Sequence, residues 1–317
     1  MKPLRLRPTR VYRFYRGGAR LARFRGSAEA DGSFPEDWVC SVTRASNPGR
    51  DHEPDEGLTR LEDGRLLREV VAEDPEGWLG ASHLARFGET TGLLVKLLDP
   101  AERVLVHAHP DRAFAATHLG SGFGKTEAWL VLETRAEEGE AFVGLREEVD
   151  PGLYHEWIER QDVDTLLGSL NRLALRAGDL VYVPAGVPHA IGGGMLIAEL
   201  QEPTDFSLVC EWKGFPVRPD DAHLGLGWDT AMHALDLGAH EPARELPRSA
   251  AAFFWADERL EPAGRFAALI VLDGEGVIGG LAARRGDVFA VPATVEEFDY
   301  GGKLRVLRCL APDPALA

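Results

Sequence analysis

A short segment in the second half of the chain combines two turns, a strand and a histidine in a fixed spacing. It begins with Gly178-Asp179, continues with the apolar run Leu180–Val183 and closes with Pro184-Ala185-Gly186 before His189. Glycine and aspartate favour tight turns, and a short apolar run bounded by turn residues is typical of a buried strand. The segment therefore predicts a strand between two turns that presents one histidine just beyond the second turn.

The same pattern recurs near the C-terminus without the histidine. Gly286-Asp287 is followed by Val288–Val291 and Pro292, and Glu297 stands eleven residues after this glycine, as His189 does after Gly178. Repetition with the loss of a candidate ligand predicts two related β modules, of which only the first binds metal. A hairpin turn at Asp273–Gly276 is expected to precede the second copy.

Composition supports a mainly β protein with many short strands and turns. The 317 residues are 44% hydrophobic, which is enough for a globular core, and the 35 glycines and 20 prolines suit many strands and turns. The net charge of −16 repels nucleic acids and anionic lipids, and the chain lacks an apolar run long enough to span a membrane. Neither nucleic acid nor a membrane is therefore an expected partner. The three separated cysteines are expected to be buried, reduced thiols, which predicts a cytoplasmic protein. We expect it to be a monomer or a homodimer.

Apolar patterning predicts the order of the elements. Helices are expected near 76–87 and 154–173, and residues 111–125 are expected to form a glycine-rich loop. The predicted strands cover residues 10–15, 92–98, 103–109, 127–133, 195–200 and 207–212. We predict a metal-binding β domain with a small helical insertion over residues 1–225 and a second, metal-free β domain over residues 226–317.

The candidate metal ligands lie on three of these predicted segments. His107 and His109 are two residues apart, so they share one face of a strand, and Glu127 starts the next one. A barrel interior can bring these side chains together with His189. Three imidazoles and one carboxylate make a complete ligand set for one divalent ion. Zinc is the favoured ion, and Mn, Fe, Co or Ni suits the same donors.

Several motifs together resemble a known enzyme family. The chain is similar to the cupin superfamily and, more narrowly, to class I mannose-6-phosphate isomerases of the short bacterial form. This similarity implies cupin or jelly-roll β-barrels with a small helical insertion, with a cupin domain over residues 1–225 and a cupin-like domain over residues 226–317. The resemblance rests on Leu94–Asp99, Val106–Asp111, Gly124–Trp129, Pro184–Ile191 and Ile197–Gln201. It implies aldose–ketose isomerisation of a sugar at a zinc-type site with His107, His109, Glu127 and His189 as ligands. His107 replaces a glutamine of the family pattern.

The resemblance also implies residues at the sugar site. Lys125 and Glu199 match family positions there and are the predicted catalytic residues. Glu199 interrupts an otherwise apolar strand, where a carboxylate is costly unless it faces a cavity or a partner, and burial raises a carboxyl pKa. Asp205 is retained from the family pattern and is a predicted substrate-binding residue.

One departure from the family pattern concerns charge. Val209 stands where the pattern has an arginine, and a valine cannot bind phosphate or polarise a substrate oxygen. Arg13, Arg16 and Lys213 are candidates to replace that arginine, and Arg16 is the predicted substrate-binding residue among them.

Three functions fit these features. The first is a metal-dependent sugar isomerase that acts on a small-molecule sugar or sugar phosphate, including an altered or unphosphorylated sugar. The second is another cupin metalloenzyme, such as a dioxygenase, because the ligand set also permits Fe or Mn chemistry. The third is a non-catalytic sugar-binding protein, which the Val209 position favours.

Overall fold

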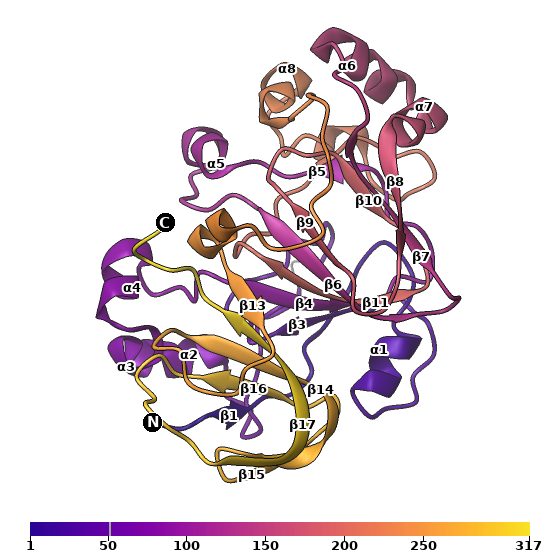
Figure 1. Cartoon of the computed structure of the whole chain (residues 1–317). Helices are drawn as coiled ribbons and strands as arrows, with labels where there is room; N and C mark the ends of the chain where they lie inside the picture. The colour runs from indigo at the N-terminus through magenta and orange to yellow at the C-terminus, as the bar shows by residue number, and fades with distance from the viewer. Residues whose placement is uncertain (51) are drawn as a thin grey trace.

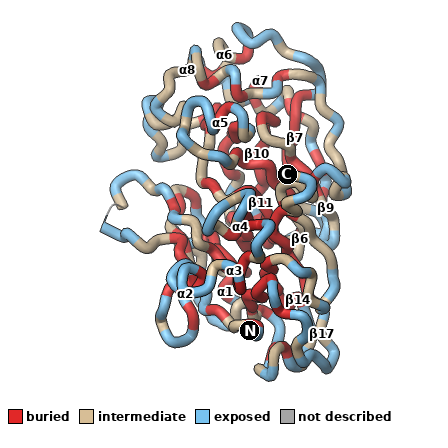
Figure 2. The backbone as a smooth tube through the Cα atoms, turned by 90° about the vertical axis from the view of Figure 1, so that its left-hand side faces the viewer, coloured by how far each residue is buried: buried red, intermediate tan, exposed pale blue. Residues whose placement is uncertain are grey.

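The computed structural model describes residues 1–50 and 52–317, and its architecture is three antiparallel β-sheets stacked in layers (Figure 1). We call them the upper, central and lower sheets, after their positions in that view. The central sheet is covered on both faces, so its strands lie deepest in the molecule. Figure 2 shows the buried backbone running through the middle of the protein, with exposed residues on the surrounding loops and helices. The mainly β, cupin-type fold predicted from the sequence is confirmed.

The central sheet carries most of the strands that were predicted from apolar patterning. Its strand order is β2–β3–β4–β11–β6–β9. The bounds are β2 Arg10–Val11, β3 Glu36–Val39, β4 Leu94–Leu98, β6 Glu127–Thr134, β9 Leu180–Val183 and β11 Met195–Gln201. The expected strand at 10–15 is therefore limited to its first two residues.

Alternation along these strands decides which side chains can form a site. In β11, Ala198 and Leu200 pack toward the lower sheet, whereas Ile197 packs toward the upper sheet. Successive side chains of a strand point to opposite faces, so Glu199 shares the face of Ile197. The same rule puts Lys96 of β4, beside Leu98, on the side of the upper sheet.

The upper sheet packs against the central sheet, and the two sheets enclose the interior of a barrel that we call the upper barrel. Its order is β12–β5–β10–β7–β8, with β5 His107–Ala108, β7 Gly139–Leu145, β8 Leu170–Leu175, β10 His189–Ile191 and β12 Leu208–Val209. Strands β5 and β12 are shorter than the predicted 103–109 and 207–212. The sequence also predicted helix as far as residue 173, but β8 begins at Leu170.

The lower sheet joins both ends of the chain. Its order is β1–β16–β14–β17–β13, and β15 pairs with β14. The bounds are β1 Leu4–Arg5, β13 Trp255–Asp257, β14 Ala267–Ile278, β15 Leu281–Arg284, β16 Val288–Val291 and β17 Tyr300–Leu310. The pairing of β1 with β16 brings the first residues into a sheet otherwise formed by the last third of the chain. The domain boundary near residue 225 stays a prediction.

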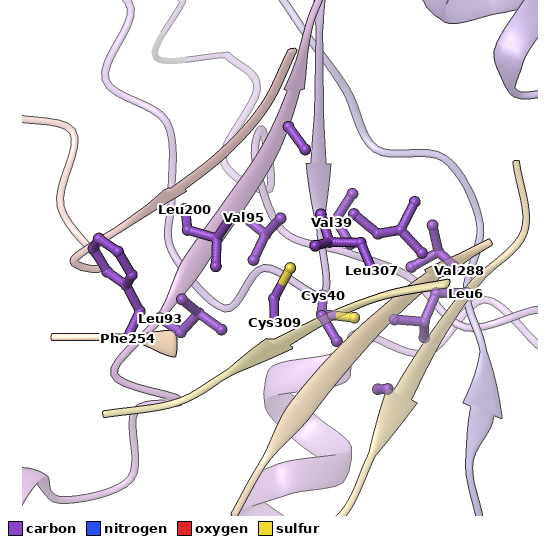
Figure 3. Close-up of a cluster of buried hydrophobic side chains, with 14 of the residues drawn as sticks. Leu6, Val39, Cys40, Leu93, Val95, Leu200, Phe254, Val288, Leu307 and Cys309 are labelled. Atoms are coloured by element: carbon purple, nitrogen blue, oxygen red, sulfur yellow. The ribbon is translucent and has the colours of Figure 1, made fainter. Parts of the chain in front are cut away.

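A large apolar cluster holds the lower sheet against the central sheet. Figure 3 shows Val95 and Leu200 of the central sheet facing Val288 and Leu307 of the lower sheet, with Cys309 between them. The three cysteines, Cys40, Cys210 and Cys309, are free and buried. Burial of this apolar surface is the main stabilising contribution to the contact between the two sheets.

Helices lie at the edges of the layers. Their bounds are α1 Ala19–Phe24, α2 Leu67–Glu73, α3 Pro75–Leu79, α4 Ala81–Phe87, α5 Arg112–His118, α6 Pro151–Arg160, α7 Val163–Gly168 and α8 Trp228–Ala231, with 3₁₀ turns at Pro219–Asp221, Met232–Ala234 and Arg248–Ala252. Tyr154 and Ile158 of α6 pack on the outer face of the upper sheet. Among the described residues, no helix is both long and apolar enough to cross a membrane.

Two local expectations were wrong. The loop expected at 111–125 contains α5, which begins because the Asp111 side chain accepts a hydrogen bond from the Phe114 backbone N–H at 2.7 Å. The hairpin turn expected at Asp273–Gly276 lies inside β14, and the turn comes instead at Gly279 and Gly280, with φ of 61° and 78°. Glycine at position 276 allows β14 to pair closely with β17, because a Cβ at this position would lie 2.0 Å from the Gly301 carbonyl oxygen.

Candidate metal centre and active site

The predicted metal ligands converge inside the upper barrel from three strands and one strand end. His107 of β5 and His189 of β10 are directly opposed in the antiparallel pairing, and His109 follows β5 by one residue. The nitrogen ligand atoms of the three histidines lie within 4.8 Å of one another. All three side chains are buried. The register of two short strands therefore forms a compact group that can hold one metal ion.

Backbone carbonyls fix the tautomer of each imidazole. The Nδ1 atoms of His107, His109 and His189 lie 2.9, 2.7 and 2.9 Å from the carbonyl oxygens of Leu105, Phe206 and Val187. A carbonyl can only accept, so each Nδ1 carries the proton and donates it. Each neutral ring then has an unprotonated Nε2, and these atoms face the centre of the group.

The contacts between these Nε2 atoms fit a cation better than any hydrogen bond. His107 Nε2 and His189 Nε2 are 3.1 Å apart, and with both protons on Nδ1 neither nitrogen can donate to the other. Two opposed lone pairs repel unless a positive charge lies between them. The donor set of the chain therefore fits a divalent ion.

Glu127 completes the group from β6. Its Oε1 lies 3.3 Å from His189 Nε2, and its Oε2 lies 3.2 Å from His109 Nε2. Trp129 donates its indole N–H to Oε1 at 2.9 Å, which fixes the carboxylate. Within the described residues, Oε2 is buried and accepts no hydrogen bond, so this oxygen is available to a ligand.

Burial sets the protonation states that a metal needs. It lowers the pKa of His109 to about 3, with Lys125 adding to the effect, and it lowers the pKa of His107 and His189 as well. Burial alone would raise the pKa of Glu127, but Lys125, His109 and His189 outweigh it and hold the pKa well below its usual value. Neutral imidazoles and an ionised carboxylate are the forms that bind metals.

A cavity opens beside this group between the central and upper sheets. Its volume is about 220 Å³, and His107, Lys125, Glu199, Asp205 and Val209 line it. Lys125 bridges the cavity and the metal group, because its Nζ lies 2.8 Å from His109 Nε2 and 3.3 Å from Glu127 Oε2. The structure thus brings the two predicted catalytic residues to one cavity.

Glu199 is a buried carboxylate with a lysine partner that sequence analysis did not identify. Lys96 Nζ lies 3.3 Å from Glu199 Oε2, and both residues line the cavity. Burial and the nearby Glu127 raise the pKa of Glu199 to about 7, although Lys96 and Lys125 oppose the shift. Lys96 occupies a polar position in the apolar strand 94–98, and this was the available signal for it.

A buried ion network forms another part of the cavity wall. The guanidinium of Arg13 donates to both oxygens of Asp205, at 2.9 and 3.2 Å, and its Nε lies 3.0 Å from Glu36 Oε2. Burial would raise the pKa of Glu36, but Arg13 and Lys96 hold it at about 2. Glu36 was not among the predicted site residues, and its partners are too far away in sequence to be inferred from spacing.

Two of the candidate substitutes for the missing arginine lie elsewhere. The Arg16 side chain is exposed and does not line the cavity, and its backbone N–H donates to Glu102 Oε1 at 2.9 Å. Lys213 is also exposed and lines a different surface pocket. Val209 is directly opposite His107 in the pairing of β12 with β5. The two departures from the family pattern are therefore neighbours beside the metal group.

Comparison with known proteins decides the family. A mannose-6-phosphate isomerase from Streptococcus mutans is 30% identical over 260 residues, which cover 72% of this chain and 78% of that protein. This chain belongs to the mannose-6-phosphate isomerase family. A mannose-6-phosphate isomerase from Bacillus subtilis is 35% identical over 134 residues, which cover 41% of this chain and 40% of the relative. No protein-family profile matches the chain.

Solved structures agree on the fold. A mannose 6-phosphate isomerase from Bacillus subtilis superposes with a TM-score of 0.74 at 23% identity, over 98% of this chain and 99% of that one. A phosphomannose isomerase mutant from Salmonella typhimurium gives a TM-score of 0.71 at 14% identity, over 98% and 100% of the two chains. The protein is thus an isomerase of this family with a cupin fold and one metal site, as the sequence predicted.

Proposed function

We propose that the enzyme interconverts an aldose and a ketose by moving a proton between C1 and C2 of the sugar. The observation that carries this proposal is the convergence of three unprotonated Nε2 atoms beside a cavity that is lined by His107 and by the buried carboxylate of Glu199. We assign His107, His109, Glu127 and His189 as the metal ligands. When bound, a divalent ion supplies Lewis-acid stabilisation of negative charge on substrate oxygens.

Glu199 is the proposed base. Its carboxylate accepts the proton from C2 of the aldose, the electron pair of the broken C–H bond becomes the C1=C2 bond of an enediolate, and the C1=O pair moves onto O1. Glu199 then returns the proton to C1 while the hydroxyl proton of O2 passes to O1, which gives the ketose, so atoms and electrons balance without an oxidant. A pKa of about 7 suits this role, because the group can both take up and release a proton near neutral pH.

Lys125 is the proposed partner of the substrate oxygen. Its buried Nζ borders the cavity beside the metal group, so its ammonium can donate a hydrogen bond to an oxygen that gains negative charge. Asp205 is proposed as a positioning residue, because both of its oxygens hold Arg13 at the cavity wall. Lys125 and Glu199 are buried, and a low local dielectric strengthens these electrostatic interactions.

The donor chemistry favours zinc, and Mn, Fe, Co and Ni suit the same ligands. The substrate class is a monosaccharide or its phosphate ester, in keeping with the names of the relatives. We further propose a cytoplasmic enzyme, because three free cysteines are expected in a reducing compartment. The proposed oligomeric state is a monomer or homodimer.

Solvent-proton exchange tests this function. Metal-loaded enzyme in D₂O should introduce deuterium at C1 or C2 of at least one sugar from a panel of aldoses and ketoses, with and without phosphate. Glu199→Gln should lower kcat by about 10²–10⁴-fold, the usual contribution of general base catalysis, and retain its metal. Glu199→Asp, which keeps a carboxylate, should retain part of the activity.

The pH profile gives a second readout of the same role. Because burial raises the pKa of Glu199 to about 7, the ionised base forms as pH rises through that value, and kcat should increase over the same interval. An absence of deuterium incorporation into every sugar, with metal bound, would contradict the proposed function.

A further inference from the structure

The charges around the cavity identify the kind of sugar that it accepts. Among the described residues, the cationic side chains that line it are Arg13, Lys96 and Lys125. Each already has a carboxylate within 4 Å. Arg13 NH2 lies 2.9 Å from Asp205 Oδ1, Lys96 Nζ lies 3.3 Å from Glu199 Oε2, and Lys125 Nζ lies 3.3 Å from Glu127 Oε2.

The guanidinium of Arg13 is the group best suited to bind a phosphate, but it is fully engaged. It forms the two-pronged contact with Asp205 that a phosphate would otherwise receive. Its NH1 also donates to Asn47 Oδ1 at 3.0 Å, and its Nε pairs with Glu36. A phosphate would have to displace the mostly buried carboxylate of Asp205, whose next cation among the described residues, Lys96, is farther away at 3.9 Å.

The carboxylates leave no excess of positive charge on the cavity wall. Among the described residues, four acidic side chains line it, Glu36, Glu199, Asp205 and Asp221, against the three cationic ones, and Asp221 is paired with Arg218 at 2.8 Å. A phosphate dianion in this space would be desolvated without an unpaired cation and would lie among like charges, which is unfavourable. The charge of a bound metal ion would be taken up by the reacting oxygens at C1 and C2, at the opposite end of a hexose from a 6-phosphate.

The rest of the wall suits an uncharged sugar. Ser46, Asn47 and Ser207 offer neutral hydrogen-bonding groups, and Val209 and Val217 contribute apolar surface. The volume of about 220 Å³ lies below the range of about 300–1,000 Å³ that is usual for ligand pockets, so a single monosaccharide fits it best.

We propose that the substrate is an unphosphorylated monosaccharide, preferred over its phosphate ester. This inference rests on the proposed isomerase activity and narrows its substrate class. Discrimination comes from the paired state of Arg13 and Lys96 and from the position of Lys125 at the reacting oxygen, which leave no cation among the described lining residues to compensate a phosphate.

Steady-state kinetics of the metal-loaded enzyme test the inference. D-Mannose and D-fructose are compared with their 6-phosphates, and a panel of free aldohexoses and aldopentoses extends the comparison. We expect kcat/KM to favour a free sugar over the phosphate esters by about tenfold or more, because like-charge contacts are strongly unfavourable. Equal values, or a preference for the phosphate esters, would overturn the inference and leave the isomerase proposal standing. No turnover of either class would overturn both.

A substitution that adds a charge to the cavity tests the inference independently. Val209→Arg places a guanidinium opposite His107, and it should shift the ratio of kcat/KM toward phosphorylated sugars by about tenfold. Val209→Met adds similar length without charge and should leave the ratio within about twofold. Inorganic phosphate should not compete with sugar in the unchanged enzyme, and competitive inhibition at concentrations below KM of the sugar would contradict the inference even if the variants fail to fold.

Discussion

Two turn-and-strand segments of this enzyme, residues 178–189 and 286–297, which we call the first and second modules, share one turn geometry and differ in what the turn supports. Gly178 and Gly286 both have positive φ, 96° and 88°. The aspartate that follows each glycine accepts a hydrogen bond from a backbone N–H three residues earlier, Arg176 to Asp179 at 2.8 Å and Arg284 to Asp287 at 3.0 Å. The Gly-Asp motif that is repeated in the sequence thus forms the same turn hydrogen bond in both copies.

The interiors of the modules diverge at equivalent positions. Glu127 pairs with Val183 in the first module, and Ala267 pairs with Val291 at the same place in the second. His189 is fully buried, whereas Glu297 is exposed on a loop. Both modules therefore have the same turn and strand, and only the first has candidate metal-binding side chains on them. Three pairs of substitutions test this division.

The largest effect is expected from the ligands. His189→Ala should weaken metal binding by more than about 100-fold, because changes to residues that merely support a ligand already cost about 10–100-fold. Glu297→Ala, its counterpart in the second module, should leave metal affinity and activity unchanged. Titration of metal-free protein with Co²⁺, followed by its absorption, measures both. If both variants lost metal affinity to the same extent, the proposed difference between the two modules would be wrong.

The glycines of the two turns should differ in the free energy of unfolding. A Cβ at Gly286 would lie 1.9 Å from the Phe24 carbonyl oxygen, whereas a Cβ at Gly178 meets nothing within 4 Å. Gly178→Ala carries only the backbone strain of positive φ, about 1–2 kcal/mol. Gly286→Ala adds a clash with α1 and should cost more than about 3 kcal/mol. Denaturant unfolding distinguishes the two, and a larger loss for Gly178→Ala would refute the explanation.

The smallest effect is expected from the turn aspartates, where the modules should behave alike. Asp179→Ala and Asp287→Ala each remove one hydrogen bond at the surface, worth about 1 kcal/mol of unfolding free energy. Thermal unfolding of both variants should show similar losses, with metal content unchanged. A difference much larger than the effect itself would mean that the shared turn has different functions in the two copies.

Local rules explain what the sequence could predict. His107 and His109 were correctly placed on one side because strand alternation is set by the backbone alone. The polar position of Glu199 in an apolar strand pointed to the cavity for the same reason. The family resemblance then supplied the order of the motifs, and the homologous isomerases support it.

Other features depend on contacts that no local pattern contains. The network of Arg13, Glu36, Lys96 and Asp205 joins residues up to 192 positions apart. The glycines near residue 275 suggest a turn, but they lie within β14, where the backbone of β17 comes too close for a side chain. Helix α5 was missed because glycines at 120, 122 and 124 dominate the composition of a segment whose first residues carry an ordinary aspartate cap.

The central claim is that one metal ion, held by the three histidines and Glu127, is required for sugar isomerisation. The direct test is to titrate metal-free enzyme with Zn²⁺ in D₂O and to record deuterium incorporation into the sugar against the number of ions bound. The account predicts no exchange without metal and a linear rise that ends at one ion per chain. Full exchange in metal-free enzyme, or a rise that continues to two ions, would contradict it.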